Sequence, residues 1–213
     1  MARPRKNQAG PNAVERMENV FWELIEKKPY NRITVENILV HSGVARTSFY
    51  YHYSNLLELA ESALTHEVKR AEIFNLMDAI LDGNVSESHL IEQSPVLKQR
   101  FRRMSLVAGP HGTYELVGLL KNLFMEVAKE ELGMRKDSWP DMESETALEF
   151  MIGGILTLFG QWPELFERWP ESFGDHPLGH ATSMVSKIFK DLKNSMHDGS
   201  LTNFWKDDKK DVA

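Results

Sequence analysis

The sequence predicts an all-α protein with two parts, an N-terminal domain at residues 1–55 and a larger helical domain at residues 56–213. Apolar residues recur at three- and four-residue spacing along most of the chain, as on one face of a helix. Pro, Gly and an Asp-Gly pair separate these runs. With 213 residues, 42% of them hydrophobic, the chain can bury a sizeable core. We therefore expect a small helical domain joined by a long helix to a larger one.

The N-terminal domain is expected to contain three helices. Apolar residues at helical spacing extend over residues 12–28, and Pro29 ends the run. Thr34 can cap a short second helix that Gly43 stops. A third short helix covers residues 45–51. Two short helices joined by a Gly-Val turn and preceded by a packing helix are typical of a helix-turn-helix motif.

The third helix is rich in side chains that donate hydrogen bonds. We expect Phe49 and Tyr53 to face the core as anchors. The outward set offers a guanidinium, hydroxyls, phenols and an imidazole, and consists of Arg46, Thr47, Ser48, Tyr50, Tyr51 and His52. Such groups suit phosphate oxygens and base edges in a DNA major groove.

Charge is distributed unevenly along the chain. Residues 1–55 hold eight Lys or Arg and five Glu, a balance of +3 in a chain whose net charge is −6. The remainder is therefore acidic. A basic first domain on an acidic second one indicates that only the first meets a polyanion, although ordinary surface scatter is the alternative.

The stretch ITVENILVHSGVARTSFYYHYSNLLEL, residues 33–59, resembles the DNA-binding segment of the TetR/AcrR family of bacterial transcriptional regulators. The positions that match the family pattern are Ile33, Thr34, Ile38, Gly43, Val44, Tyr50 and His52. Tyr53 takes the place of the usual Phe, Leu39 that of a common Ala, and Asn55 that of the usual Lys. The resemblance is confined to the first part of the chain.

The resemblance implies roles for individual residues at double-stranded DNA. It assigns Tyr50 and His52 to phosphate contacts, and the groove to Arg46, Thr47, Ser48 and Tyr51. Thr34 can add a phosphate contact from the N-terminus of its helix. Asn55, at the start of the fourth helix, completes the set.

The first residues form a basic arm that contains Arg3, Arg5 and Lys6. The arm either reaches the DNA backbone or minor groove, or it is a terminal tail without contacts.

The second domain is predicted to be helical throughout. A long helix begins at Ser54 and ends at the turn formed by residues 82–84. The further helical runs cover residues 88–92, 95–107, 114–132, 144–159 and 178–196, with a proline-interrupted loop between Pro163 and Pro177. The tail from Asp198 is polar.

Two late helices carry faces suited to a homodimer. The predicted interface residues are Ala147, Met151, Gly154, Ile155 and Leu158 on the first, and Ala181, Val185, Ile188 and Leu192 on the second. A small-residue face and a heptad-like seam can form a four-helix bundle across a two-fold axis. The family resemblance implies the same dimer, and packing inside one chain is the alternative.

Aromatic and methionine side chains in the second domain suit an apolar pocket for a small organic effector. The candidate effector-binding residues are Phe101, Met104, Tyr114, Phe124, Met125, Phe150, Met151, Phe159 and Trp162. Arg103 and His111 are available to orient a polar end. Core packing is the alternative for each of them.

Composition and motifs disfavour several other classes of protein. The chain has no cysteine, which excludes disulfides, thiolate metal sites and a cysteine nucleophile. No phosphate loop, dinucleotide fingerprint or nucleophile elbow occurs, and His176 and His180 lack a third metal ligand at a recognised spacing. No apolar leader or membrane-spanning run occurs, so we expect a cytoplasmic protein without membrane contact. We expect neither an enzyme nor a cofactor.

Two functions remain from the sequence. The first, implied by the resemblance, is a dimeric repressor that binds a palindromic operator and releases it when an apolar effector binds. The second is a protein-binding adaptor of the same fold without sequence-specific DNA binding.

Overall fold

A computed structural model describes residues 11–68, 94–131 and 142–168, together with Lys187, Asp191 and Asn194. These residues contain seven α-helices, one short 3-10 turn and no strand. The described part of the chain is therefore all-α, as predicted.

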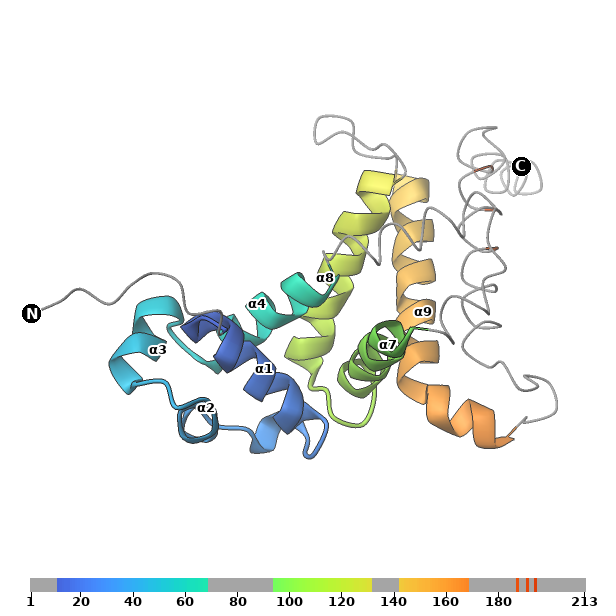
Figure 1. The fold of residues 1–213 in the computed structure, drawn as a ribbon. Helices are drawn as coiled ribbons and strands as arrows, with labels where there is room; N and C mark the ends of the chain where they lie inside the picture. The colour runs from blue at the N-terminus through green and yellow to red at the C-terminus, as the bar shows by residue number, and fades with distance from the viewer. Residues whose placement is uncertain are drawn as a thin grey trace, which may run out of the picture.

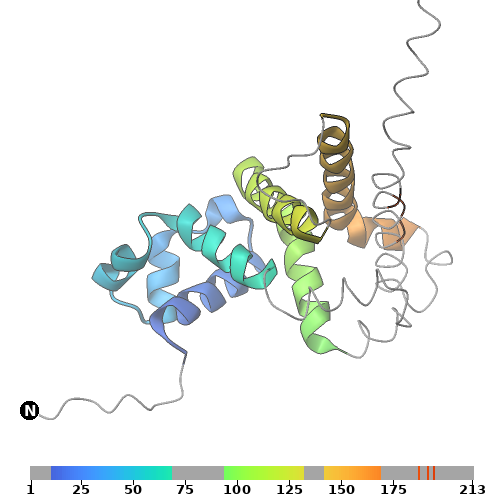
Figure 2. The same ribbon diagram turned by 90° about the horizontal axis from the view of Figure 1, so that it is seen from above.

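The helices form two groups that lie side by side in both views (Figures 1 and 2). We call helices α1–α4 the head and helices α7–α9 the body. The head consists of α1 (Ala13–Ile25), η1 (Tyr30–Arg32), α2 (Val35–Ser42), α3 (Arg46–His52) and α4 (Leu56–Val68), and the body of α7 (Pro95–Ala108), α8 (Tyr114–Glu131) and α9 (Met142–Arg168). Helix α4 packs on α1 and on α8, so it links the two groups.

Short-range hydrogen bonds fix where the first helices begin. The Asn12 side chain accepts from the backbone N–H of Glu15, whose carboxylate in turn accepts from the backbone N–H of Asn12. Thr34 and Asn37 form the same reciprocal pair at the start of α2, which confirms the predicted cap. Each of these reciprocal pairs, called a capping box, satisfies two backbone N–H groups that have no carbonyl partner within the helix.

The turn between α2 and α3 is built as predicted. Gly43 has φ of +64°, a left-handed conformation that costs a glycine little because it lacks a Cβ. Val44, directly after it, is 6% exposed. Phe49 is fully buried and Tyr53 is 7% exposed, so both expected anchors face the core.

One continuous hydrophobic core runs through head and body. It includes Phe21 on α1, Leu64 on α4, Leu120 on α8 and Ile152 on α9, each fully buried or nearly so. The core crosses the predicted domain boundary at residue 55, because the buried face of α4 serves both groups.

Helix α9 extends beyond the predicted end at residue 159 and includes Pro163. Proline removes one helical hydrogen bond and favours a bend, and Figure 1 shows the C-terminal part of α9 turning away from the rest of the helix. Several predicted segments lie outside the described residues: the arm at residues 1–10, the later part of the long fourth helix, the run at residues 88–92 and almost all of the last helix.

Candidate functional site

The exposed face of α3 is created by the burial of the opposite face. The side chain of Phe49, on the inner face of α3, is fully buried, and its neighbours along the helix are accessible to solvent. Tyr50 is 50% exposed and Tyr51 84% exposed. Arg46, Thr47 and His52 are exposed as well, and Ser48 is half-buried. The structure therefore leaves the predicted groove and phosphate residues of α3 exposed or half-buried around the buried Phe49.

Ring contacts hold the aromatic side chains of α3. Tyr50 meets Phe49 edge-on at a centroid distance of 5.3 Å, and Tyr51 meets His52 edge-on at 5.0 Å. Such edge-to-face pairs contribute roughly 0.5–1.5 kcal/mol beyond burial. These contacts favour a few orientations of each ring. They therefore limit the positions that the tyrosine hydroxyl groups and the imidazole nitrogens can take.

Arg46 is paired with an acidic residue of the preceding helix. Its Nη2 lies 2.5 Å from Oε2 of Glu36, and both side chains are more than half exposed. An exposed ion pair contributes only about 0–1 kcal/mol. The guanidinium can therefore exchange this carboxylate for another acceptor at little cost.

A lysine that was not among the predicted site residues contacts the N-terminus of α2. Asn37, the partner of Thr34 in the cap, also accepts a hydrogen bond of 2.7 Å from Nζ of Lys28. The turn at Pro29 and η1 folds the chain back so that Lys28 reaches α2. Nothing in the spacing of Lys28 indicates this contact.

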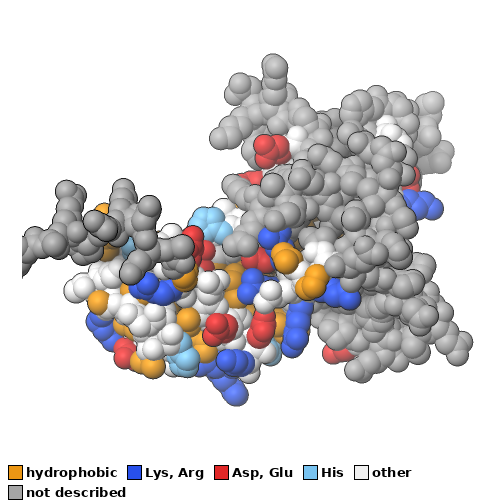
Figure 3. All heavy atoms as spheres, in the orientation of Figure 1, with side chains coloured by type: hydrophobic (Ala, Val, Ile, Leu, Met, Phe, Trp, Pro, Cys, Tyr) orange, Lys and Arg blue, Asp and Glu red, His pale blue; other side chains and the backbone are white. Residues whose placement is uncertain are grey.

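Asn55 is exposed and caps α4, since its Oδ1 accepts a hydrogen bond of 3.0 Å from the backbone N–H of Glu58. Its side-chain oxygen is thus used within its own helix. The predicted arm residues Arg3 and Arg5 lie outside the described residues. Figure 3 shows basic, acidic and histidine side chains mixed over the visible face of the head.

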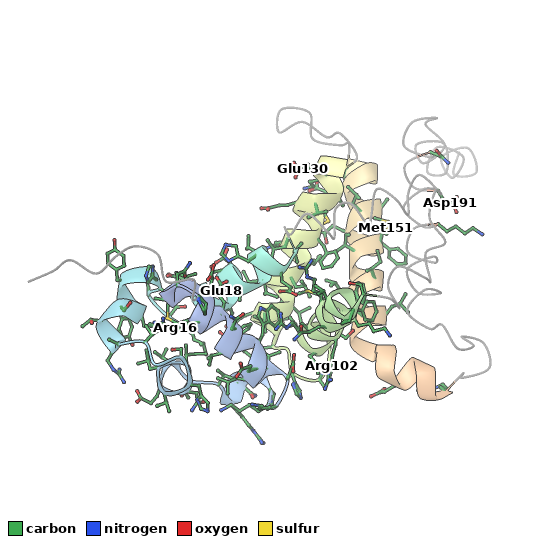
Figure 4. All side chains as sticks on the ribbon, viewed as in Figure 1. Arg16, Glu18, Arg102, Glu130, Met151 and Asp191 are labelled. Carbon is green, nitrogen blue, oxygen red and sulfur yellow. The ribbon has the colours of Figure 1, made fainter. Side chains whose placement is uncertain are left out.

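A buried carboxylate holds the end of α3 against α1 and α4. Glu18 is 7% exposed and lies where α1 meets α4 (Figure 4). It accepts hydrogen bonds from Ser62 Oγ at 2.7 Å and Tyr53 Oη at 3.3 Å, and it pairs with His66 Nδ1 at 2.9 Å. Burial, with the nearby Glu18 charge, raises the pKa of Tyr53 to about 12. None of these four residues was among the predicted site residues, although Ser62 and His66 are four residues apart, the spacing of one helix face.

The body brings together only some of the predicted effector residues. Phe159 of α9 contacts Phe101 of α7 at 4.8 Å and Phe124 of α8 at 6.2 Å between ring centroids. Met104, Met125 and Met151 are buried. By contrast, Tyr114 is 95% exposed and Phe150 is 85% exposed, so the structure places neither among the side chains enclosed by the three helices. The Trp162 side chain lies outside those the structure describes.

The candidate dimer residues of α9 fall on two sides of the helix. Ile155 and Met151 are buried within the protomer, at 2% and 7% exposure. Gly154 is exposed together with Phe150, and Ala147 and Leu158 are half-buried. The outward surface of α9 therefore contains Phe150, which sequence reasoning placed in the pocket. The candidates Ala181, Val185, Ile188 and Leu192 lie outside the described residues.

Arg103 and His111, considered for an effector, are engaged at the contact between head and body. Arg103 pairs with Glu67 and Glu26, and His111 Nδ1 donates to the backbone carbonyl of Ile25. Arg103 thus joins α7 to the head, and His111 joins the turn between α7 and α8 to the end of α1.

Within the described ranges, no helix has the length and apolar character needed to cross a membrane. The same ranges contain no group of three His, Asp or Glu side chains arranged to hold a metal ion. In comparisons with known proteins, the chain matches no protein-family model and no curated protein.

Proposed function

We propose that the chain is a dimeric DNA-binding transcriptional regulator of the TetR/AcrR type, a repressor whose operator affinity falls when an apolar small molecule binds the body. The observation that carries this proposal is the pairing of α2 and α3 through Gly43, with Phe49 buried and the donor-rich face of α3 exposed. In this proposal α2 and α3 act as a helix-turn-helix, whose second helix enters the major groove.

The side chains on α3 divide into two roles in this proposal. Tyr50 and His52 contact phosphate oxygens, which fix the register of the protein on DNA. Arg46, the first residue of α3, exchanges its ion pair with Glu36 for contacts to base edges. A guanidinium can form a bidentate hydrogen-bonded pair with guanine. Thr34 and Lys28 add donors at the start of α2.

The positive charge of the first domain comes from its arm. Residues 11–55 contain as many Lys and Arg as Glu, so the balance of +3 in residues 1–55 is carried by Arg3, Arg5 and Lys6. Such positive charges supply much of a protein's affinity for DNA, and this contribution falls as the salt concentration rises. We therefore include the arm in the proposed DNA contact.

Dimerisation through α9 would give two copies of α3 on one face of the DNA. The exposed Phe150 and Gly154 offer an apolar side chain next to a position where a second helix can approach closely. Two recognition helices separated by one turn of DNA, about 34 Å, can enter successive major grooves. A palindromic operator follows from that symmetry.

The effector in this proposal binds near the ring cluster of Phe101, Phe124 and Phe159, with the buried methionines of the body as an adaptable lining. It acts by favouring an arrangement of the two heads that does not fit the operator.

A fluorescence-anisotropy titration tests the proposal. The full chain is titrated against DNA from upstream of its own gene, with random duplex as competitor and at two salt concentrations. We expect specific binding with two or four subunits per site, weakening steeply with salt because each phosphate neutralised by Lys or Arg contributes a slope of about −0.9 in log affinity against log salt. Binding no tighter than to random DNA, together with a stable dimer, would instead favour the adaptor.

A further inference from the structure

The side chain of Arg103, on body helix α7, contacts two helices of the head at once. Its Nη1 donates to Oε2 of Glu67 on α4 at 3.2 Å, and its Nε lies 3.8 Å from Oε1 of Glu26, the C-cap residue of α1. Its guanidinium carbon lies 5.1 Å from the ring centroid of Trp22, also on α1. One rigid, planar guanidinium group thus joins α7 to both α1 and α4.

The charges that face α4 at this contact are largely buried, so they resist rearrangement, whereas the side chain of Glu26 is 29% exposed. The side chain of Glu67 is 2% exposed, that of Arg100 5% and that of Arg103 15%. Arg100 Nε lies 3.6 Å from the second oxygen of Glu67. A buried carboxylate is costly unless it is paired, and separating it from its partner typically costs several kcal/mol. A rotation of the head that pulls Glu67 from Arg103 is therefore disfavoured.

The turn between α7 and α8 makes a second contact with the head. His111 Nδ1 donates to the carbonyl oxygen of Ile25 at the end of α1, and the backbone N–H of Tyr30 donates to the carbonyl oxygen of His111 at 2.9 Å. Because the acceptor of the imidazole is a carbonyl, Nδ1 must carry a proton. The turn between α7 and α8 is thus hydrogen-bonded through His111 to the end of α1 and to η1.

The same turn is pressed against α9. A Cβ added to Gly109 would lie 2.4 Å from the carbonyl oxygen of Gly160, and one added to Gly160 would lie 2.5 Å from that of Ala108. Only glycines allow this approach. The contacts therefore connect α9, the proposed dimer helix, through the turn and α7 to α1 and α4 of the head.

We propose that Arg103 is a positioning residue that determines which half-site spacing the dimer accepts, an inference that rests on the function proposed above. One base pair inserted between half-sites moves the second by about 3.4 Å and rotates it by about 35°. A head held by Arg103 and His111 cannot follow that displacement. Without Arg103 the head is held by fewer contacts, those of Arg100 and His111, and can follow the displacement more easily.

The test measures binding of the full-length chain to duplexes that differ only in half-site spacing. The cognate site is first selected by the wild-type chain from a random duplex library. Affinities are then measured for that site, for the same site lengthened or shortened by one and two base pairs, and for a duplex with a single half-site. The variants are Arg103→Met and Arg103→Lys, the second of which retains the charge but not the fork of donors. Lys121→Met is the matched control, since it removes an ion pair with Glu149 inside the body.

We expect each altered spacing to weaken wild-type and Lys121→Met binding by about tenfold, the size of one disrupted base contact. For Arg103→Met the same loss should fall to about twofold or less, while affinity for the single half-site stays at the wild-type value. Arg103→Lys should lie between them, and it decides the question if circular dichroism shows that Arg103→Met does not fold.

Two outcomes would overturn the inference. Arg103 variants that keep the wild-type spacing preference show that other contacts set it, and variants that lose affinity equally on every duplex, half-site included, show a merely structural role. A different result refutes the proposed function itself: a wild-type chain that enriches no duplex from the library has no site whose spacing Arg103 could determine.

Discussion

The phenolic oxygen of Tyr53 lies 3.3 Å from Oε1 of Glu18, so the residue that ends α3 is tied to a buried carboxylate on α1. Ser62 and His66 of α4 bind the same carboxylate. The orientation of the exposed face of α3 therefore depends on one acidic group in the interior of the head.

Glu18→Ala should destabilise the protein by about 2 kcal/mol, because the hydroxyl groups of Tyr53 and Ser62 lose a buried acceptor. Urea unfolding followed by circular dichroism measures the change. Glu23→Ala, at an exposed position of the same helix, should change stability by less than about 0.5 kcal/mol. Equal effects of the two substitutions would show that the Glu18 cluster adds no stability.

Alkaline pH should destabilise the protein through its two buried tyrosines. Burial raises the pKa of Tyr53 to about 12, and burial with the nearby charge of Glu115 does the same for Tyr30. An unfolded tyrosine ionises near 10, so their contribution is complete below about pH 10 and is lost as the pH rises towards 12. Thermal melts across this interval should fall less steeply for Tyr53→Phe than for wild type. A double Tyr30→Phe and Tyr53→Phe variant that follows the wild-type curve contradicts the assignment.

Gly109→Ala should destabilise the protein by about 1–3 kcal/mol, because the new methyl group meets the carbonyl oxygen of Gly160 and the turn must shift. Gly153→Ala in α9 is the control, since its Cβ would meet no atom within 4 Å. There alanine should be neutral or stabilising by up to about 1 kcal/mol, as it favours helix. Melting temperatures in the opposite order would place the close approach elsewhere.

The double variant Tyr50→Phe, His52→Ala should bind every DNA sequence more weakly, because both side chains are assigned to phosphates. Arg46→Ala is the contrasting variant: it should cost about 1–3 kcal/mol at the cognate site and relax sequence preference. Competition titrations with cognate and random duplexes distinguish the two patterns. Loss confined to the cognate site in the double variant would refute its phosphate role.

Phe150→Glu should convert the proposed dimer into monomers, because it places a charge on the exposed apolar position of α9. Sedimentation velocity measures the species present. Tyr114→Glu, at an even more exposed aromatic position on α8, should leave the dimer intact. A dimer that survives Phe150→Glu moves the interface away from this face of α9.

The short-range features of the head were predictable. The Thr34 cap, the turn at Gly43 and the inward direction of Phe49 follow from spacing and from the conformational preferences of single residue types. In α9 the same reasoning placed the helix correctly but ended it too early, because Pro163 signals a break and the structure accommodates it within a bent helix.

The side on which a body residue lies was not predictable in the same way. Ile155 and Phe150 are both apolar and both fit the pattern of α9, yet one is 2% exposed and the other 85%. Helical spacing shows which residues share a face, but not which neighbour covers that face. That depends on how α9 crosses α7 and α8.

For the described residues, the sequence by itself determined the all-α class, the order of the helices and the chemical character of α3, because these depend on residues close together in the chain. Only the tertiary structure decided that Glu18 binds Tyr53, Ser62 and His66, and that Arg103 joins α7 to α1 and α4. Those contacts join residues far apart in sequence. Their geometry is set by the angles at which whole helices pack, a property that no local pattern encodes.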